Sequence, residues 1–266
     1  MRDTILEPAR RATALWLLAG LDPSGGAGIL RDGWTARACA PNLSIARVVT
    51  AWTRQGQGRV ARAEARDADA VAAELQTMPP PSAVKLGLLP APLVDVVLRE
   101  VASRRVPVVL DPVLVASDGG PLGGDAEALR AALEALADES WLITPNLDEA
   151  RAMAGVPQVG LAALAARLGR ASVLLKDGHG EDPSWVRDHL WLRGHVHEFA
   201  RARLPGHSPR GTGCALATAI ACGLAAGRPL PAAVASAVAW LDAARQRCAP
   251  GPDGRPHLPR DAPPLA

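Results

Sequence analysis

Tyrosine is absent from this sequence of 266 residues, and phenylalanine occurs only once. Proteins that bind single-stranded nucleic acids stack the bases on aromatic side chains, so this composition speaks against that function. A surplus of charge is also missing, because 29 basic and 27 acidic residues leave a formal net charge of +2. So small a charge gives no reason to expect nucleic acid or a membrane surface as the partner.

Long apolar runs are missing too, and no stretch has the roughly 20 residues that a membrane-spanning helix needs. The apolar run at 14–19 follows Arg10 and Arg11 and faintly resembles an export signal. The run is short and no small-residue cleavage pattern follows it, so we expect a buried first strand there. With 48% hydrophobic and 21% charged residues, the chain has the composition of a globular protein.

Cysteine is sparse, with four residues at Cys39, Cys214, Cys222 and Cys248. No two of them have the C-x-x-C spacing that zinc sites and redox motifs use. A chain of this length buries a core large enough to need no disulfide, so we expect a reducing, cytoplasmic location.

What the chain does have is an alternation of short apolar runs with helical stretches rich in Ala and Leu. We expect strands at 14–19, 46–51, 83–86, 106–110, 141–143 and 172–175, and helices at 29–39, 68–76, 92–103, 125–137 and 161–168. This alternation predicts an α/β fold in which a mostly parallel sheet carries helices on both faces. A hairpin of strands 185–192 and 195–200, and then helices at 212–226 and 230–248, complete a single domain over residues 1–266, with peripheral tails at 1–12 and 249–266.

The strongest local signal is the stretch Gly211-Thr212-Gly213-Cys214, which opens directly into an Ala-rich helix. Glycines let backbone amides turn inward, and the N-terminus of a helix adds its dipole, so this loop predicts an anion hole suited to a phosphoryl group. A helix N-terminus also lowers the pKa of a thiol, so Cys214 can accept a proton from an attacking hydroxyl. The alternative is a glycine-rich helix cap with a small buried cysteine, and the loop alone does not choose between them.

A second glycine-rich turn, at 20–28, follows the first strand but has neither the P-loop nor the dinucleotide-binding spacing. Asp32 lies one turn into the next helix. Its carboxylate can accept hydrogen bonds from an aminopyrimidine, and the alternative is a solvated charge near a helix N-terminus.

Two later loops carry polar residues that suit a nucleotide. Asn146 and Glu149 are three residues apart and share one face if a helix starts there. An amide and a carboxylate suit a hydrated Mg²⁺, although an ordinary helix start with an acidic first turn is favoured when the motif is taken alone. Lys176 can neutralise nucleotide phosphates. His179 is better explained as a loop residue than as a base.

The order of these loops in the sequence is a more specific indication of function than any single loop, because each follows a predicted parallel strand. Ligands bind beyond the carboxyl ends of such strands. Together the loops supply an anion hole, a metal site and a basic residue, which are the parts that transfer of a phosphoryl group from ATP needs.

This order resembles the hydroxymethylpyrimidine/phosphomethylpyrimidine kinases of thiamin synthesis, a branch of the ribokinase superfamily, from residue 15 to about 248. Six stretches carry the resemblance in the family's order, at 22–29, 85–88, 111–122, 144–150, 176–179 and 211–214. The resemblance implies a ribokinase-like three-layer α/β/α sandwich. It also implies a kinase that uses ATP and Mg²⁺ to phosphorylate 4-amino-5-hydroxymethyl-2-methylpyrimidine and its monophosphate. The family is often dimeric, so a homodimer is considered, although no segment of the sequence marks an interface.

The resemblance also implies roles for individual residues. The pyrimidine would be held by Asp32 and Gln55, in a pocket lined by Gly20, Leu88 and Val113. The nucleotide would be bound by Asn146, Glu149 and Lys176, with Mg²⁺ held through water by the first two. The anion hole and the base would be Gly211, Thr212, Gly213 and Cys214. Most of the superfamily carries Asp at the base position, and Cys is typical of this branch and of some related pyridoxal kinases.

Several departures from the family pattern bear on the substrate. Ser208-Pro209-Arg210 stands where the family has Asn-Thr-His, Asp177 replaces a glycine, Gly56-Gln57 replaces Asn-Thr, and Leu88 replaces Met. One alternative is therefore a pyridoxal kinase on the same scaffold, which the pair of Asp32 and Gln55 disfavours. Another is a catalytically weakened paralogue that binds pyrimidine. Retention of Cys214, Asn146 and Glu149 argues against that reading.

Overall fold

The structure is a computed structural model that describes residues 13–54, 62–114, 131, 142–169, 171–178, 182–204, 209–252 and 254–262. Several sequence-based expectations lie outside these residues: the tail at 1–12, Gln55 and the Gly56-Gln57 pair, His179, Ser208 and, apart from Ala131, the helix at 125–137.

In the described part of the chain, nine strands form one sheet in the order β3-β2-β1-β4-β5-β6-β7-β8-β9. They are β1 (Ala14–Leu21), β2 (Ser44–Arg54), β3 (Arg62–Ala65), β4 (Pro81–Leu86), β5 (Val108–Leu110), β6 (Leu142–Ile143), β7 (Ser172–Leu175), β8 (Trp185–Leu192) and β9 (His195–Ala202). The six strands from β2 to β7 in this order pair in parallel, whereas β3 at one edge and the β8–β9 hairpin at the other pair antiparallel. The mostly parallel sheet expected from the sequence is confirmed.

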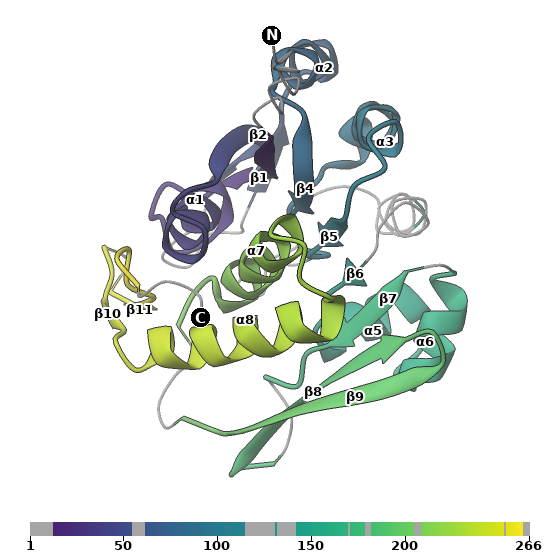
Figure 1. The fold of residues 1–266 in the computed structure, drawn as a ribbon, viewed down its shortest axis with the longest axis vertical. Helices are drawn as coiled ribbons and strands as arrows, with labels where there is room; N and C mark the ends of the chain where they lie inside the picture. Colours follow the sequence, from purple (N-terminus) through teal and green to yellow (C-terminus); the bar gives the residue numbers. More distant parts are fainter. Residues whose placement is uncertain are drawn as a thin grey trace, which may run out of the picture.

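Helices cover both faces of the sheet (Figure 1). One face carries α1 (Gly28–Cys39), α7 (Thr212–Ala225) and α8 (Leu230–Arg245), and the other carries α2 (Ala68–Thr77), η1 (Ala91–Leu93), α3 (Val94–Ala102), α5 (Leu147–Ala154) and α6 (Leu161–Arg167). Strand β1 shows how one sequence serves both layers. Its residues Leu15 and Leu17 pack against the first set of helices, and Trp16 and Leu18 pack against the second. Because side chains alternate along a strand, a continuous apolar run buries both faces of a central strand.

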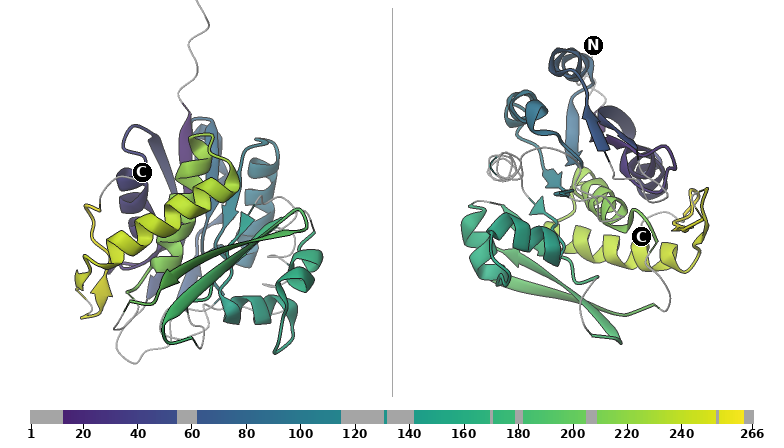
Figure 2. Two further views of the ribbon diagram at one scale, coloured as in Figure 1. Left: turned by 60° about the horizontal axis from the view of Figure 1, so that its bottom comes forward. Right: turned by 180° about the vertical axis from the view of Figure 1, so that it is seen from behind.

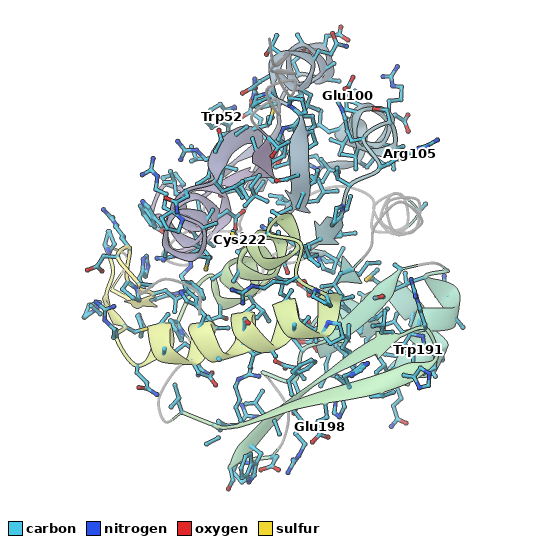
Figure 3. The ribbon with its side chains drawn as sticks, viewed as in Figure 1. Trp52, Glu100, Arg105, Trp191, Glu198 and Cys222 are labelled. Atoms are coloured by element: carbon cyan, nitrogen blue, oxygen red, sulfur yellow. The ribbon has the colours of Figure 1, made fainter. Side chains whose placement is uncertain are left out.

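In the first helical layer α7 lies between α1 and α8, so segments far apart in the sequence are neighbours (Figure 2). Cys222 of α7 lies against α1, where its thiol hydrogen-bonds Cys39 (Figure 3). At the other end of the layer, Arg201 of β9 reaches Asp242 of α8 with 3.2 Å between Nε and Oδ1. The first contact ties α7, whose N-terminus carries the Gly-Thr-Gly stretch, to α1, and the second ties α8 to the sheet.

Two local elements differ from the sequence-based expectation. Strand β3 was not expected, because Arg62–Ala65 is short and polar; it forms by antiparallel pairing with the end of β2. The expected helix at 92–103 begins as the short η1 after Pro90, because proline fixes an extended residue at the helix boundary before α3 continues.

The C-terminal tail is more than a surface segment. Its two short strands are β10 (Ala249–Pro250) and β11 (Pro256–His257), and β10 is exposed as expected. Beyond β11, however, Leu258 is only 2% exposed and belongs to the core of the first helical layer. The tail is therefore not peripheral at His257, Leu258 and Ala262, which are buried, whereas Arg260 and Asp261 are exposed. None of the described helices has the length and apolar character needed to cross a membrane.

Candidate active site

Three neighbouring parallel strands deliver polar side chains to one edge of the sheet. Asp111 follows β5, Asn146 follows β6, and Lys176 follows β7. Lys176 Nζ lies 3.0 Å from Asp111 Oδ1 and 3.9 Å from Glu149 Oε2. The structure thus brings Lys176 close to the Asn146–Glu149 element, and the binding of a nucleotide by these residues stays a prediction. Burial alone would lower the pKa of Lys176, but the two carboxylates raise it above the ordinary value, so the ammonium is charged.

Asn146 and Glu149 form the start of α5. Asn146 Oδ1 accepts a hydrogen bond from the Glu149 amide, and Glu149 Oε2 accepts one from the Asn146 amide, both at 2.8 Å. This reciprocal pair is a capping box, so the two side chains share a face as expected while also closing the helix. Burial, partly offset by Lys176, raises the pKa of Glu149 to about 7.

The oxygen donors at this edge suit a divalent cation. Asp111 and Glu149 are buried carboxylates that share one ammonium, and Glu149 is hard to ionise there without further positive charge. Carboxylate and amide oxygens are the ligands that Mg²⁺ prefers, with water completing its shell. The residues present therefore fit a hydrated Mg²⁺, although the described residues include no cluster of three acidic, His or Cys side chains that would bind a metal without water or substrate.

The Gly-Thr-Gly stretch faces the same edge. Gly211 is the N-cap of α7 and has φ of 75°, a left-handed conformation that glycine adopts without strain. A Cβ placed on Gly213 would lie 3.1 Å from Lys176 Nζ and 3.6 Å from Asp111 Oδ1. A side chain at this position would require the lysine to yield by a few tenths of an ångström, so glycine favours the close approach. The start of α7 therefore lies directly beside the cationic side chain of Lys176.

A cavity of about 340 Å³ opens between this edge, the β8–β9 hairpin and α8. Its walls include Asn146, Lys176, Thr212 and Gly213 from the predicted site. They also include three arginines that the sequence did not single out, Arg201, Arg203 and Arg245. A basic cavity of this size suits a nucleotide with its phosphates toward the start of α7.

Cys214 is partly accessible in the first turn of α7. Burial raises the pKa of its thiol to about 12, and Lys85 lowers it only in part. This direction is opposite to the thiolate expected from the helix N-terminus, because loss of solvent outweighs the positive charge of Lys85. The thiol hydrogen-bonds the Asp111 carboxylate, and the Gly28 amide hydrogen-bonds the sulfur.

Asp32 lies beneath this region with no solvent exposure. Its Oδ2 is 2.7 Å from Lys85 Nζ, and its Oδ1 accepts a hydrogen bond of 3.0 Å from Thr218. The alternative of a solvated charge is wrong. Direct binding of a pyrimidine by Asp32 stays a prediction, and a ligand would have to share the carboxylate with two protein donors.

The other residues expected to hold the pyrimidine lie near one another. A Cβ on Gly20 would lie 2.8 Å from Leu88, and Leu88 packs with Ala51 in a small apolar cluster that Val113 also joins. Gly20, Leu88 and Val113 therefore lie close together, and their role in lining a pyrimidine pocket stays a prediction. Gln55 lies outside the described residues.

Two of the departures from the family pattern point away from the cavity. Asp177 Oδ2 accepts a hydrogen bond of 3.4 Å from the Arg187 amide, and Arg210 is paired with Asp22 at 3.0 Å. Neither side chain adds its charge directly to the cavity wall.

Lys85 and Asp111 are functional candidates whose roles the sequence reasoning missed, although both stand in motifs that it quoted. The available signal was a charged residue inside or directly after an apolar strand, since a buried charge requires a partner. Composition offered a second signal. The whole sequence has only two lysines, Lys85 and Lys176, against 27 arginines. Both lie at this edge of the sheet, where a compact ammonium fits between carboxylates.

Transfer of a phosphoryl group to a small molecule is the chemistry that this sheet edge and helix start can perform together, so the chain is a phosphotransferase with a ribokinase-like fold. Its family follows from sequence. The sequence model of the phosphomethylpyrimidine kinase family matches residues 22–257, and the chain belongs to this family.

Comparison with individual relatives leads to the same family. The chain is 34% identical to a hydroxymethylpyrimidine/phosphomethylpyrimidine kinase of Streptomyces coelicolor over 85% of this chain and 86% of that protein. It is 35% identical to the enzymes of the same name from Rhizobium meliloti and Salmonella typhimurium, over 85% of this chain and 88% of each of those proteins.

Solved structures confirm the fold. A pyridoxal kinase of Bacillus subtilis in an ADP complex superimposes with a TM-score of 0.82 at 23% identity, over 94% of this chain and 98% of that one. A phosphomethylpyrimidine kinase of Clostridium difficile superimposes with a TM-score of 0.69 at 24% identity, over 86% of this chain and 98% of that one.

Proposed function

We propose that this kinase transfers the γ-phosphoryl group of ATP to hydroxymethylpyrimidine and then to its monophosphate, in the cytoplasm, as a step of thiamin synthesis. One observation supports the proposal above the others: Lys176 lies between two carboxylates and against Gly213 of the anion hole. The curated relatives carry this pair of activities in their names and are similar over most of their length.

The nucleotide is proposed to occupy the basic cavity, with its phosphates between Lys176 and the amides of residues 211–214. Asn146, Glu149 and Asp111 would hold Mg²⁺ through water, and the ion would supply neutralisation of phosphate charge. Lys176 adds a fixed positive charge to the phosphate site, next to the carboxylates of Asp111 and Glu149. The backbone amides of the helix start are aimed at the group in transfer, which stabilises its developing charge without reorganisation.

In the first reaction, the hydroxymethyl oxygen of the pyrimidine forms a bond to the γ-phosphorus. The bond between that phosphorus and the β,γ-bridging oxygen breaks, and ADP leaves with the electron pair. Cys214 takes up the hydroxyl proton. Because the resting thiol hydrogen-bonds Asp111, that carboxylate is an acceptor for the proton that the thiol already carries. In the second reaction, an oxygen of the monophosphate takes the place of the hydroxyl.

The pyrimidine is proposed to lie against Gly20, Leu88 and Val113, with Gln55 and Asp32 recognising its ring nitrogens and amino group. A pyridoxal kinase would use the same transfer apparatus, and the solved pyridoxal kinases share the fold. The departures that motivated a weakened paralogue are accommodated away from the cavity, since Asp177 and Arg210 both bind protein atoms. A homodimer stays a prediction.

The test is a side-by-side turnover assay with hydroxymethylpyrimidine, its monophosphate and pyridoxal, each with Mg²⁺-ATP. We expect ADP release with the first two at a higher kcat/KM than with pyridoxal. A higher kcat/KM with pyridoxal would instead identify the chain as a pyridoxal kinase. Tight pyrimidine binding without ADP release would instead make it a binding paralogue.

A further inference from the structure

We propose that Arg210 is a positioning residue that holds the anion loop, defined as residues 211–214, in register with the glycine loop, defined as residues 22–28. This proposal rests on the proposed function, because it concerns the geometry of the same phosphoryl transfer. Arg210 stands where the family has His, and its guanidinium does not line the cavity.

Asp22 organises the glycine loop from within. Its Oδ1 accepts from the Ser24 amide at 3.0 Å, and its Oδ2 accepts from the Ser24 hydroxyl at 2.9 Å and the Ala27 amide at 3.1 Å. Arg210 adds the charged partner, with its NH2 group 3.0 Å from the same Oδ2. Asp22 is 3% and Arg210 8% exposed, so each carries a charge that the other must compensate.

The two loops touch at their backbones. A Cβ on Gly211 would overlap the carbonyl oxygen of Gly26, so the start of α7 rests directly on the glycine loop. At the far end of that loop, the Gly28 amide hydrogen-bonds the Cys214 sulfur. A shift of the glycine loop would therefore move both a support of the anion hole and a hydrogen-bond donor to Cys214.

Arg210 also ties in the C-terminal tail. Its backbone amide donates to the Pro256 carbonyl at 3.1 Å, and its backbone forms an isolated parallel β-bridge with His257. The His257 ring in turn lies against the glycine loop, since a Cβ on Gly26 would be 2.9 Å from it. The tail is anchored beyond this point by Arg31, which donates to the Leu258 carbonyl at 2.7 Å. One residue thus joins three segments that are far apart in the sequence.

Charge gives a second reason for an arginine here. An uncompensated carboxylate at Asp22 would stand beside a loop that has to bind the transferring phosphate, and in a poorly solvated site the repulsion would act over several ångströms. Arg210 compensates that charge from the side of the glycine loop that faces the tail.

The experiment compares R210Q, D22N and the double variant with the wild type in the ATP assay with hydroxymethylpyrimidine. R228Q is the matched control, because Arg228 also makes a side-chain hydrogen bond, to Ser236, but beyond the other end of α7. Hydrogen–deuterium exchange of peptides covering 209–216 is measured on the same proteins without any ligand.

For R210Q we expect kcat to fall by about tenfold or more with the KM for the pyrimidine within roughly threefold, because small displacements of catalytic groups cost rate more than binding. The 209–216 amides should exchange faster in R210Q and D22N, and R228Q should change neither quantity. The double variant should lose less than the sum of the two single variants, since both remove the ion pair between Arg210 and Asp22. Should R210Q fail to fold, R210K, which keeps the charge, should retain more turnover and slower exchange than R210A.

A kcat for R210Q within about twofold of the wild type, or unchanged exchange at 209–216, would overturn the positioning role. Equal loss in R210K and R210A would do the same. A wild type without turnover would refute the proposed function instead, and the exchange measurement, which needs no substrate, would still decide whether Arg210 holds the anion loop.

Discussion

Lys85 and Asp32 form an ion pair of 2.7 Å in which neither side chain has any solvent exposure. The pair joins β4 to α1, and Thr218 adds a hydrogen bond to the same carboxylate from α7. Burial alone would lower the pKa of Lys85, but Asp32 raises it above its ordinary value, so the lysine is charged. The carboxyl end of β4 is therefore held to α1 and α7 by charge as well as by apolar packing.

Removing one partner of this pair should destabilise the protein strongly. We expect K85M to lower the free energy of unfolding by about 3–5 kcal/mol, because it leaves Asp32 buried without its counter-charge. Urea denaturation measures the loss, and R151Q, which breaks the exposed pair of Arg151 with Asp148, is the control that should change little. A small loss for K85M would show that Asp32 is relieved in another way, by water, by another cation or by taking up a proton, since burial raises its pKa.

Asp32 has a second expected readout, because the proposed function gives it a part in binding the pyrimidine. D32N should raise the KM for hydroxymethylpyrimidine beyond what the loss of folded protein explains, when activity is corrected for the folded fraction. A D32N protein with an unchanged KM would assign Asp32 to folding alone.

The reactivity of Cys214 should depend steeply on pH. Since burial raises its pKa to about 12, the thiolate fraction of the protein without ligands should increase about tenfold per pH unit between pH 7 and 9. Alkylation by iodoacetamide, followed by mass spectrometry of the peptide containing Cys214, measures this rate. A rate that levels off below pH 8 would mean that the helix N-terminus stabilises the thiolate, as the sequence suggested.

Lys176 should matter for transfer more than for folding of the sheet. K176Q should lower kcat/KM for ATP by about 100-fold or more, because it removes the fixed charge opposite the anion hole. R187Q is a suitable control, since Arg187 pairs with Asp182 on the outer part of β8 and does not line the cavity. Comparable losses in both variants would contradict a specific role for Lys176.

Gly211 is expected to tolerate no side chain. G211A should lose stability and most turnover, because alanine is strained at φ of 75° and its Cβ would overlap the Gly26 carbonyl. G227A separates the two causes, since Gly227 has φ of 78° but open space around it, and it should show only the conformational cost of about 1 kcal/mol. Equal thermal shifts in the two variants would show that the contact with Gly26 is unimportant.

The parallel sheet and most of its helices could be predicted from the sequence because apolar periodicity is a local property. The same holds for the loops that carry Asn146, Lys176 and Gly213, since a parallel sheet brings the ends of its strands to one edge. The Arg210–Asp22 pair could not be predicted, because its members are 188 residues apart and no pattern links them. The pKa of Cys214 was also beyond reach, since the helix start is visible in the sequence and the depth of burial is not.

The sequence has no lysine other than Lys85 and Lys176, and this has a practical consequence. Both ε-amines of the chain are enclosed, with Lys85 unexposed and Lys176 12% exposed. Acylating reagents should therefore modify the folded protein hardly at all beyond its α-amino group. Any acylation of Lys85 would be a direct chemical record of the moments when β4 and α1 separate, and it needs no engineered probe.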